Sequence, residues 1–137
     1  MAVYRKYFSE SQLKDMEDSG PNWGVNVHTV GHYVHPPQRI YPDPGHPSTH
    51  AFQWKKGRRL QEFQIVYIAG GKGLYEGEGM ETVGIEAGTI MLLFPNTWHR
   101  YKPTLETGWE EFWVGFDGVF ADYLMRQECF DPHKPLI

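Results

Sequence analysis

Short runs of β-forming residues, divided by glycine-containing turns, make up the chain from residue 51 to residue 118. The clearest runs are 62–68 (EFQIVYI), 89–95 (TIMLLFP) and 108–116 (GWEEFWVGF), which are rich in aromatic and β-branched residues. Many such runs at close spacing, with helical periodicity only near the chain ends, are typical of a β-barrel or a jelly roll. We therefore expect an all-β fold of roughly eight strands.

The two ends of the chain have a different periodicity. Residues 9–18 (SESQLKDMED) predict one short helix, and residues 119–130 (VFADYLMRQECF) gather apolar side chains on one helical face. These patterns divide the chain into three parts. They are an N-terminal arm with a short helix (1–24), a barrel (25–118) and a C-terminal helix (119–137).

Three shorter segments also have patterns that predict local structure. Residues 25–30 (VNVHTV) alternate as a half-buried strand does. Residues 35–50 contain five prolines and are expected to form a long irregular loop. Residues 69–73 (AGGKG) are expected to form a turn after the strand at 62–68.

The side-chain pattern predicts how some of these elements pack. The strand at 89–94 is almost continuously apolar, so we expect it to be covered on both faces. The C-terminal helix is expected to pack on the outer face of strand 108–116, and Phe120 and Tyr123 lie on its apolar face. Cys129 is expected to be a small core residue.

Composition and charge exclude several classes of protein. The 137 residues, 40% of them hydrophobic, are those of one globular domain, and no apolar run approaches the roughly 18–20 residues that span a bilayer. The net charge of −4 argues against nucleic-acid binding, which requires a basic face. The basic cluster of Lys55, Lys56, Arg58 and Arg59 is expected to be a solvated hairpin tip. A single cysteine and a start without a signal-peptide pattern indicate the cytoplasm.

The strand at 108–116 has the most informative side chains. By its period of two, Trp109, Glu111 and Trp113 share one face with Gly115. Indole rings stack on the C–H faces of sugars, and a carboxylate accepts hydrogen bonds from hydroxyl groups, so this face could bind a carbohydrate. The alternative is that both indoles belong to an ordinary core and that Glu111 lies at a wet barrel mouth.

Three segments resemble the sugar-sensing domain of AraC-family transcription regulators. They are IVYIAGGKGLYEG (65–77), IEAGTIMLLFPNTWHRYKP (85–103) and GWEEFWVGFDG (108–118). The residues that precede them, 46–64, resemble the lead-in of the same domain, so the resemblance covers about residues 23 to 130. It implies a cupin-like double-stranded β-helix, that is, a jelly-roll barrel, with short flanking helices.

The resemblance also implies where a ligand would bind. In this family the two strands at 98–103 and 108–116 line a barrel cavity that holds the effector, and Arg58 would enter the same barrel. The candidate ligand-binding residues are Trp113, Glu111, Tyr101, His99, Trp109 and Arg58. The arabinose-sensing member has a histidine in place of Glu111, so the identity of its sugar does not carry over.

By this resemblance the chain is an effector-sensing domain. A small carbohydrate or a similar polar molecule would bind in the barrel and control DNA binding by a C-terminal helix-turn-helix domain that is absent from the chain. Dimerisation would be a property of the full-length regulator, because most of the expected interface is also absent. The resemblance implies no cofactor, no metal and no catalytic residue.

Two other functions are weighed against this interpretation. A metal-dependent cupin enzyme, such as a sugar isomerase or dioxygenase, needs histidines that the strand RRLQEFQIVYI lacks; of that ligand set only His99 is present. A zinc site built from His46, His50 and His99 is the remaining option, and we expect no enzyme. The other alternative is a barrel filled by its own side chains, which binds nothing and acts as an assembly module.

Overall fold

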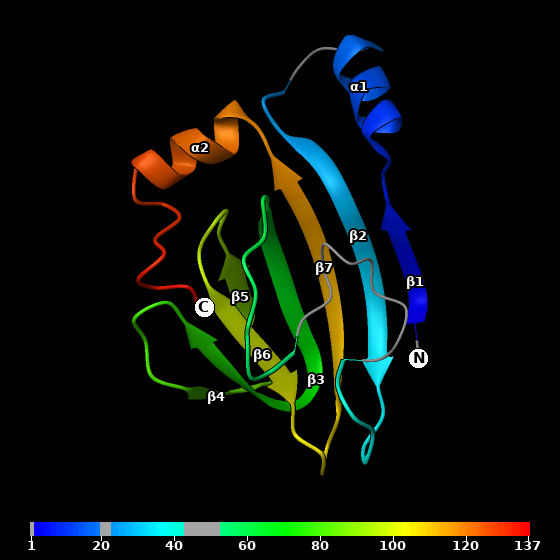
Figure 1. Cartoon of the computed structure of the whole chain (residues 1–137), viewed down its shortest axis with the longest axis vertical. Coiled ribbons are helices and arrows are strands. Elements are labelled where there is room, and N and C mark those ends of the chain that lie inside the picture. Colours follow the sequence, from blue (N-terminus) through cyan, green and yellow to red (C-terminus); the bar gives the residue numbers. More distant parts are fainter. Residues whose placement is uncertain (1, 20–22, 43–52) are drawn as a thin grey trace.

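The computed structural model of the chain describes residues 2–19, 23–42 and 53–137 (Figure 1). Its elements, in order, are β1 (Ala2–Tyr7), α1 (Glu10–Ser19), β2 (Asn26–His35), β3 (Phe63–Gly77), β4 (Val83–Glu86), β5 (Ile90–Leu93), β6 (His99–Pro103), β7 (Trp109–Asp117) and α2 (Val119–Arg126). Neither helix in these described ranges is long and apolar enough to cross a membrane.

All strand pairs are antiparallel, and the strands curl into two layers as a jelly roll does. The hydrogen-bonded order is β1-β2-β7-β3-β4, with β5 and β6 also paired to β3. Both helices lie at the same end of the molecule, next to the N-terminal end of β2 and the C-terminal end of β7 (Figure 1). The expected all-β jelly roll with short flanking helices is confirmed.

The turn expected at residues 69–73 is wrong, because β3 runs through these residues without a break. Its first half pairs with β7 and β5, and its second half pairs with β4 and β6. The register shifts between Ile68 and Gly70, and at Gly71 a Cβ atom would overlap the backbone of Gly108. The glycines therefore let one strand bend sharply and pass from one layer into the other.

The N-terminal half contains more strand than its sequence indicates. Residues 2–7 form β1, which pairs with β2 so that Tyr7 lies opposite Thr29. The strand predicted at 25–30 continues to His35, into the segment that was expected to be a loop. Residues 36–42 have no regular structure, as predicted, and residues 43–50 lie outside the described residues.

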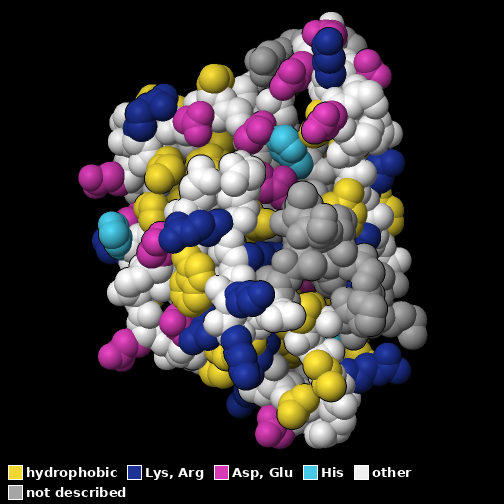
Figure 2. Space-filling view, viewed as in Figure 1, with side chains coloured by type: hydrophobic (Ala, Val, Ile, Leu, Met, Phe, Trp, Pro, Cys, Tyr) yellow, Lys and Arg dark blue, Asp and Glu magenta, His cyan; other side chains and the backbone are white. Residues whose placement is uncertain are grey.

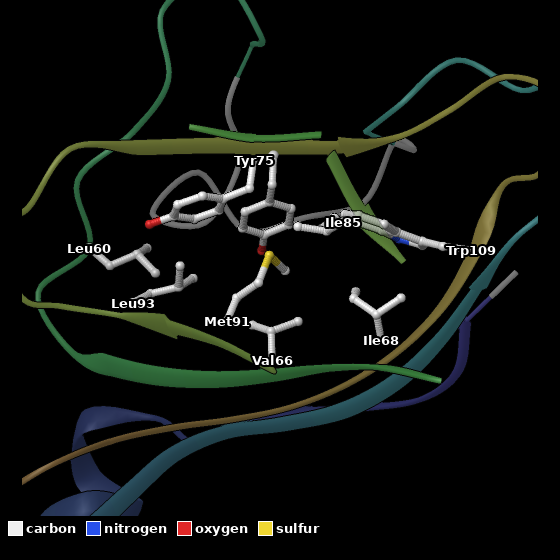
Figure 3. Packing of buried hydrophobic residues seen from close by; sticks show 9 residues of the cluster. Leu60, Val66, Ile68, Tyr75, Ile85, Met91, Leu93 and Trp109 are labelled. Carbon is white, nitrogen blue, oxygen red and sulfur yellow. The ribbon is translucent and has the colours of Figure 1, made fainter. Parts of the chain in front are cut away.

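The core between the two layers is apolar along most of its length. Val66 and Ile68 point from β3 toward Tyr75 and Ile85 of the opposite layer (Figure 3). The prediction that 89–94 is covered on both faces is confirmed, since Met91 and Leu93 join this inner cluster while Leu92 and Phe94 join a second cluster with Phe63, Phe116 and Phe130.

The C-terminal helix packs differently from the prediction. Ala121 is the residue that α2 buries, while Phe120 and Tyr123 are 48% and 49% exposed. Phe116 on the outer face of β7 contacts the second cluster together with Ala121, but Phe112 stays exposed. Cys129 is exposed and not a core residue. Helical periodicity alone did not reveal the buried face, because the small Ala121 allows the closest approach to the sheet.

Candidate functional site

The inner face of β7 carries the residues that the period-two pattern grouped together. Trp109 lies opposite His35 of β2, Glu111 opposite Tyr33, and Trp113 opposite Gly31. Because directly opposed residues of an antiparallel pair point to the same side, this face turns into the barrel. Trp109 and Glu111 are 2% and 5% exposed, which agrees with that placement.

Gly31 determines where the indole of Trp113 lies. A Cβ atom at Gly31 would overlap the six-membered ring of Trp113, so the glycine gives the ring space to lie over β2. Gly115, two residues further along β7, is packed in the same way against Thr29 and Glu62. Gly31 and Gly115 therefore leave space for these side chains along one wall of the barrel.

A hairpin before β3 carries Arg58 to the barrel. Gln53 and Gly57 form an isolated bridge, and the backbones of Arg58 and His99 exchange two hydrogen bonds of 2.9 and 3.0 Å. The ring of Trp98 covers Gly57, whose φ of 64° favours glycine, and its Nε1–H donates to the carbonyl of Lys56 at 2.8 Å.

The basic cluster on this hairpin is divided between surface and interior. Lys55 and Lys56 are exposed, as predicted for a hairpin tip, and Arg59 pairs with Glu78 at 2.5 Å. Figure 2 shows Lys and Arg side chains across the middle of the face that this hairpin shares with β6. Arg58 alone of these four directs its hydrogen bonds into the barrel.

The Arg58 guanidinium binds two aromatic side chains of β6. Its Nε–H donates to Nε2 of His99 at 3.1 Å, and an NH2 hydrogen goes to the Tyr101 hydroxyl at 2.5 Å. The same group lies 5.2 Å from the centroid of the Tyr101 ring, within the range of a cation–π contact. The rings of His99 and Tyr101 are almost parallel, at 7°, so both side chains share one face of β6 as predicted.

His99 is neutral in this arrangement. Burial and the charge of Arg58 lower the pKa of His99 from 6.5 to about 3, and the bond to the backbone of Thr97 opposes this only in part. Nδ1–H donates to the Thr97 carbonyl at 3.2 Å, so Nε2 carries the lone pair that accepts from Arg58. Both ring nitrogens are therefore occupied.

Glu111 is a buried carboxyl with an unused oxygen. Its Oε2 has no hydrogen-bond partner in the part of the chain that the structure describes. Burial raises the pKa of Glu111 to about 7, although the charges of Arg58 and Arg5 act to lower it. The indole Nε1–H of Trp109 also has no acceptor among the described residues. A buried polar atom without a partner costs stability, so both atoms are candidates for a ligand.

A cavity of about 20 Å³ lies beside Glu111, with room for about one water molecule. Four of the predicted site residues line it, Arg58, Tyr101, Glu111 and Trp113. His99 does not line the cavity but contacts Arg58 and Tyr101, which do, and Trp109 packs against Tyr101 with ring centroids 5.7 Å apart. The structure therefore brings all six predicted residues into one neighbourhood.

Tyr7 and Gln64 also line the cavity, and the sequence did not reveal them. Tyr7 comes from β1, whose sequence YRKY has no alternation of polar and apolar residues and is typical of a solvated arm. Gln64 lies opposite Gly115 and donates to Glu62 at 2.9 Å. A polar residue at an inward position of β3 was the one signal available, because its apolar neighbours Val66 and Ile68 share that face.

Two other histidines lie close to carboxylates. Nε2 of His28 is 2.8 Å from Asp117, and Nε2 of His32 is 2.7 Å from Glu110. Within the described ranges, no group of three His, Cys, Asp or Glu side chains could hold a metal ion. His46 and His50, from the zinc alternative, lie outside those ranges.

The fold is similar to that of several solved structures. The protein YhaK from Escherichia coli superposes with a TM-score of 0.51 at 14% identity, over 86% of this chain and 45% of that chain. A predicted oxalate decarboxylase from Thermotoga maritima gives 0.46 at 16% identity (84% and 79%), and a cupin protein from Bacteroides fragilis gives 0.43 at 19% (74% and 73%). The chain thus spans less than half the length of YhaK.

A search of curated protein sequences finds no match to the chain. The family described as the AraC-like ligand binding domain matches residues 26–136, which include every strand from β2 to β7 and all six predicted site residues. The chain therefore belongs to the family of AraC-like ligand-binding domains, with a cupin-like jelly-roll barrel.

Proposed function

We propose that this chain is the effector-sensing domain of an AraC-type transcription regulator in the bacterial cytoplasm. The barrel binds a small carbohydrate or a similar polar molecule and does not catalyse a reaction on it. Binding changes how a helix-turn-helix domain of the same regulator engages DNA, so DNA is a partner of that domain and not of the barrel. Dimerisation belongs to the whole regulator.

The Oε2 of Glu111, which has no hydrogen-bond partner among the described residues, carries this proposal. A buried carboxyl oxygen beside a cavity can accept a hydrogen bond from a molecule that enters the cavity, and a ligand hydroxyl can take the place of a water molecule there. Arg58 and the hydroxyls of Tyr7 and Tyr101 lie around the same cavity. The guanidinium of Arg58 donates hydrogen bonds and the two hydroxyls can both donate and accept, as a polyhydroxylated molecule requires. Trp113 adds an aromatic surface for the C–H face of a sugar.

Thermal unfolding in the presence of a sugar panel tests the proposal. The panel contains D-xylose, L-arabinose, D-galactose, D-glucose, D-glucuronate and short oligosaccharides, each with and without EDTA. A ligand that binds only the native state raises the melting temperature. At a ligand concentration of one hundred times its Kd, the free energy of unfolding increases by about 2.7 kcal/mol. We expect one class of sugar to do so, independently of EDTA.

Matched variants on the two faces of β7 assign the effect to the barrel. Glu111→Gln and Trp113→Ala should abolish the shift, whereas Glu110→Gln and Phe112→Ala, on the outer face, should retain it. A shift that survives both inner-face substitutions would contradict a site in the barrel. A shift that EDTA removes would support a metal enzyme.

The contacts of His99 argue against that enzyme. Metal binding by His99 needs a free ring nitrogen, and here Nδ1 bonds to Thr97 while Nε2 bonds to Arg58. A metal ion would also bring positive charge next to the guanidinium of Arg58.

The small cavity favours a second candidate, a barrel that binds no effector and serves only in assembly. A space of about 20 Å³ cannot hold a sugar. This candidate predicts that no member of the panel shifts the melting temperature and that Glu111→Gln stabilises the fold, because it removes a buried ionisable group with no binding role.

A further inference from the structure

Tyr41 fills part of the barrel from outside the sheets. It belongs to the irregular segment 36–42 that follows β2, yet its ring lies among side chains of three strands. The ring centroid of Tyr41 is 5.4 Å from His35, 5.8 Å from Trp109 and 6.4 Å from Tyr101. The contacts to His35 and Trp109 are edge-to-face, at 82° and 76°.

The hydroxyl of Tyr41 also takes part in the polar contacts of the site. It donates to the oxygen of Tyr101, which accepts from Arg58 as well. Glu111 is near enough for its charge to act on both phenols. Burial raises the pKa of Tyr41 well above its ordinary 10, so the group stays a neutral donor. Tyr41 therefore presents to the site a ring with one hydroxyl group.

The segment that carries Tyr41 is attached to the barrel before this residue. Gln38 N–H donates to the Leu105 carbonyl at 2.7 Å, and the Arg39 carbonyl bonds to the buried His35 ring at 3.0 Å. Ile40, the next residue, is 85% exposed. Tyr41 belongs to none of the strand pairs of the described residues, so it can leave the barrel without breaking a strand pairing.

A surface groove lies on the other side of Tyr41. It has a volume of about 440 Å³, and Tyr41 lines it together with Ile40, Trp54, Leu74, Lys102 and Leu105. Tyr41 contacts Tyr101 and Trp109 on its inner side, so it stands between this groove and the barrel interior.

We propose that Tyr41 occupies the ring subsite of the effector, and that a pyranose sugar binds by taking its place. The sugar ring would pack on Trp109 and Tyr101, one hydroxyl would donate to the Tyr101 oxygen, and others would reach Glu111 and the indole N–H of Trp109. This inference rests on the proposed function and deepens it, since it names the ligand class and the residue that closes the site.

The chemistry of the subsite selects a pyranose. A six-membered ring has the size of the phenol that it replaces and presents C–H groups to the indole face. It carries hydroxyls around its rim, which can bond together to Oε2 of Glu111 and Nε1–H of Trp109, the two atoms that lack a partner in the described part of the chain. An apolar ring would leave both atoms unpaired, and an open-chain polyol would lose more conformational freedom on binding.

Titration calorimetry with two kinds of probe tests this inference. The first probe is p-cresol, which is the side chain of tyrosine, and the second is the pyranose panel of D-xylose, L-arabinose, D-galactose and D-glucose. The variant is Tyr41→Ala, and the matched control is Tyr67→Ala, which removes a tyrosine that is 42% exposed on the outer face of β3.

The expected results concern the wild type and Tyr41→Ala together. Tyr41→Ala should bind p-cresol, and the wild type and Tyr67→Ala should not. One pyranose should compete with p-cresol, and it should bind Tyr41→Ala about tenfold more tightly than the wild type, because no side chain has to be displaced. Tyr67→Ala should bind that pyranose as the wild type does.

Two different failures can be told apart. If a pyranose binds the wild type and Tyr41→Ala equally and does not compete with p-cresol, the sensing function stands and the role of Tyr41 is overturned. If p-cresol binds Tyr41→Ala but no member of the panel binds any variant, the proposed carbohydrate sensor fails, and the ligand class fails with it.

A label at position 41 measures directly whether this residue leaves the barrel, and it does so without truncation of the side chain. We expect 4-fluorophenylalanine at this position to show one buried ¹⁹F resonance in the free protein and a solvent-exposed one after the pyranose is added. Tyr41→Phe, which keeps the ring and loses only the bond to Tyr101, should bind the sugar more tightly than the wild type. An unchanged ¹⁹F resonance at saturating sugar would overturn the inference.

Discussion

Two glutamates that are neighbours in the sequence show how differently the two faces of β7 are built. Glu110 points outward, where its Oε1 lies 2.7 Å from Nε2 of His32 and its side chain is 41% exposed. Glu111 points inward, is 5% exposed and leaves one oxygen without a partner among the described residues. The carboxyl of Glu110 is exposed to solvent and contacts a histidine, whereas the Oε2 of Glu111 has neither kind of contact among the described residues.

The difference indicates what each face is for. An exposed ion pair contributes little to stability, and evolution can replace it at small cost. A buried carboxyl beside a cavity destabilises the fold, and such groups persist where they bind or react. The inner face of β7 therefore has a composition that stability alone does not explain, while the outer face is explained by solubility and packing.

Truncation of the aromatic residues should show the largest contrast between these faces. Trp109→Ala removes a side chain that is 2% exposed in the inner cluster, and we expect it to cost about 3–5 kcal/mol. Phe112→Ala, at a position that is 41% exposed, should cost about 1 kcal/mol. Urea denaturation measures both values, and equal costs would contradict the assignment of the faces.

The pH dependence of the free energy of unfolding should distinguish Glu111 from His99, because the pKa values of these two buried groups are shifted in opposite directions. The pKa of Glu111 is raised from 4.5 to about 7, so this group stabilises the fold below pH 4.5 and loses that contribution as the pH rises to about 7. The pKa of His99 is lowered from 6.5 to about 3, so its contribution is present above pH 6.5 and is lost as the pH falls. Between pH 4.5 and 6.5 the two effects oppose each other.

Substitution of one of these two groups should reveal how the other makes the free energy of unfolding depend on pH. In Glu111→Gln the His99 effect remains, and the free energy of unfolding should rise by about 2–3 kcal/mol from pH 4.5 to 6.5. In His99→Gln it should fall by a similar amount over the same interval. The wild type and Glu110→Gln should stay nearly flat in comparison. Parallel curves for all four proteins in urea titrations would refute the pKa shifts.

Glycine substitution tests how closely the inner wall is packed. Gly31→Ala would place a Cβ within the ring of Trp113, and we expect a loss of about 1–3 kcal/mol together with weaker sugar binding. Gly84→Ala is the matched control, because no atom lies within 4 Å of the Cβ that it would add. Thermal unfolding of the two variants checks this, and a neutral Gly31→Ala would mean that Trp113 has space to move.

The smallest effect should come from the outer ion pair. Glu110→Gln removes the contact with His32, and we expect a cost of about 0.2–1 kcal/mol that decreases at high salt. Denaturation at two salt concentrations measures it. A cost as large as that of Trp109→Ala would show that the outer face of β7 is more than a solvated surface.

Much of the barrel could be predicted because strand periodicity is local. The alternation from Trp109 to Gly115 placed Trp109 and Glu111 on one face, which is the buried one. The apolar run at 89–94 predicted a strand that is covered on both faces. The family resemblance added Arg58, whose neighbours on the hairpin are exposed and give no local sign of its direction. Whether these residues bind a ligand stays a prediction.

The residues that the sequence did not reveal depend on long-range contacts. β1 becomes a strand because it pairs with β2 beyond an intervening helix, and its own residues have no apolar alternation. Tyr41 lies in a proline-rich segment where no period applies, and only its contacts with His35, Trp109 and Tyr101 place it in the barrel. The turn predicted at 69–73 is wrong because glycines occur both in turns and at bends within a strand.

The bent strand β3 has a consequence for the order in which the molecule opens. It is the hydrogen-bond partner of β4, β5, β6 and β7, and it belongs to both layers. Neither layer can separate while β3 remains paired, so its amide protons near the bend should exchange with solvent only through global unfolding. β1 pairs with β2 alone, and its amides should exchange through local opening, at far lower free energy. Hydrogen exchange should therefore be slow in β3 and fast in β1, the edge strand that carries Tyr7 to the cavity.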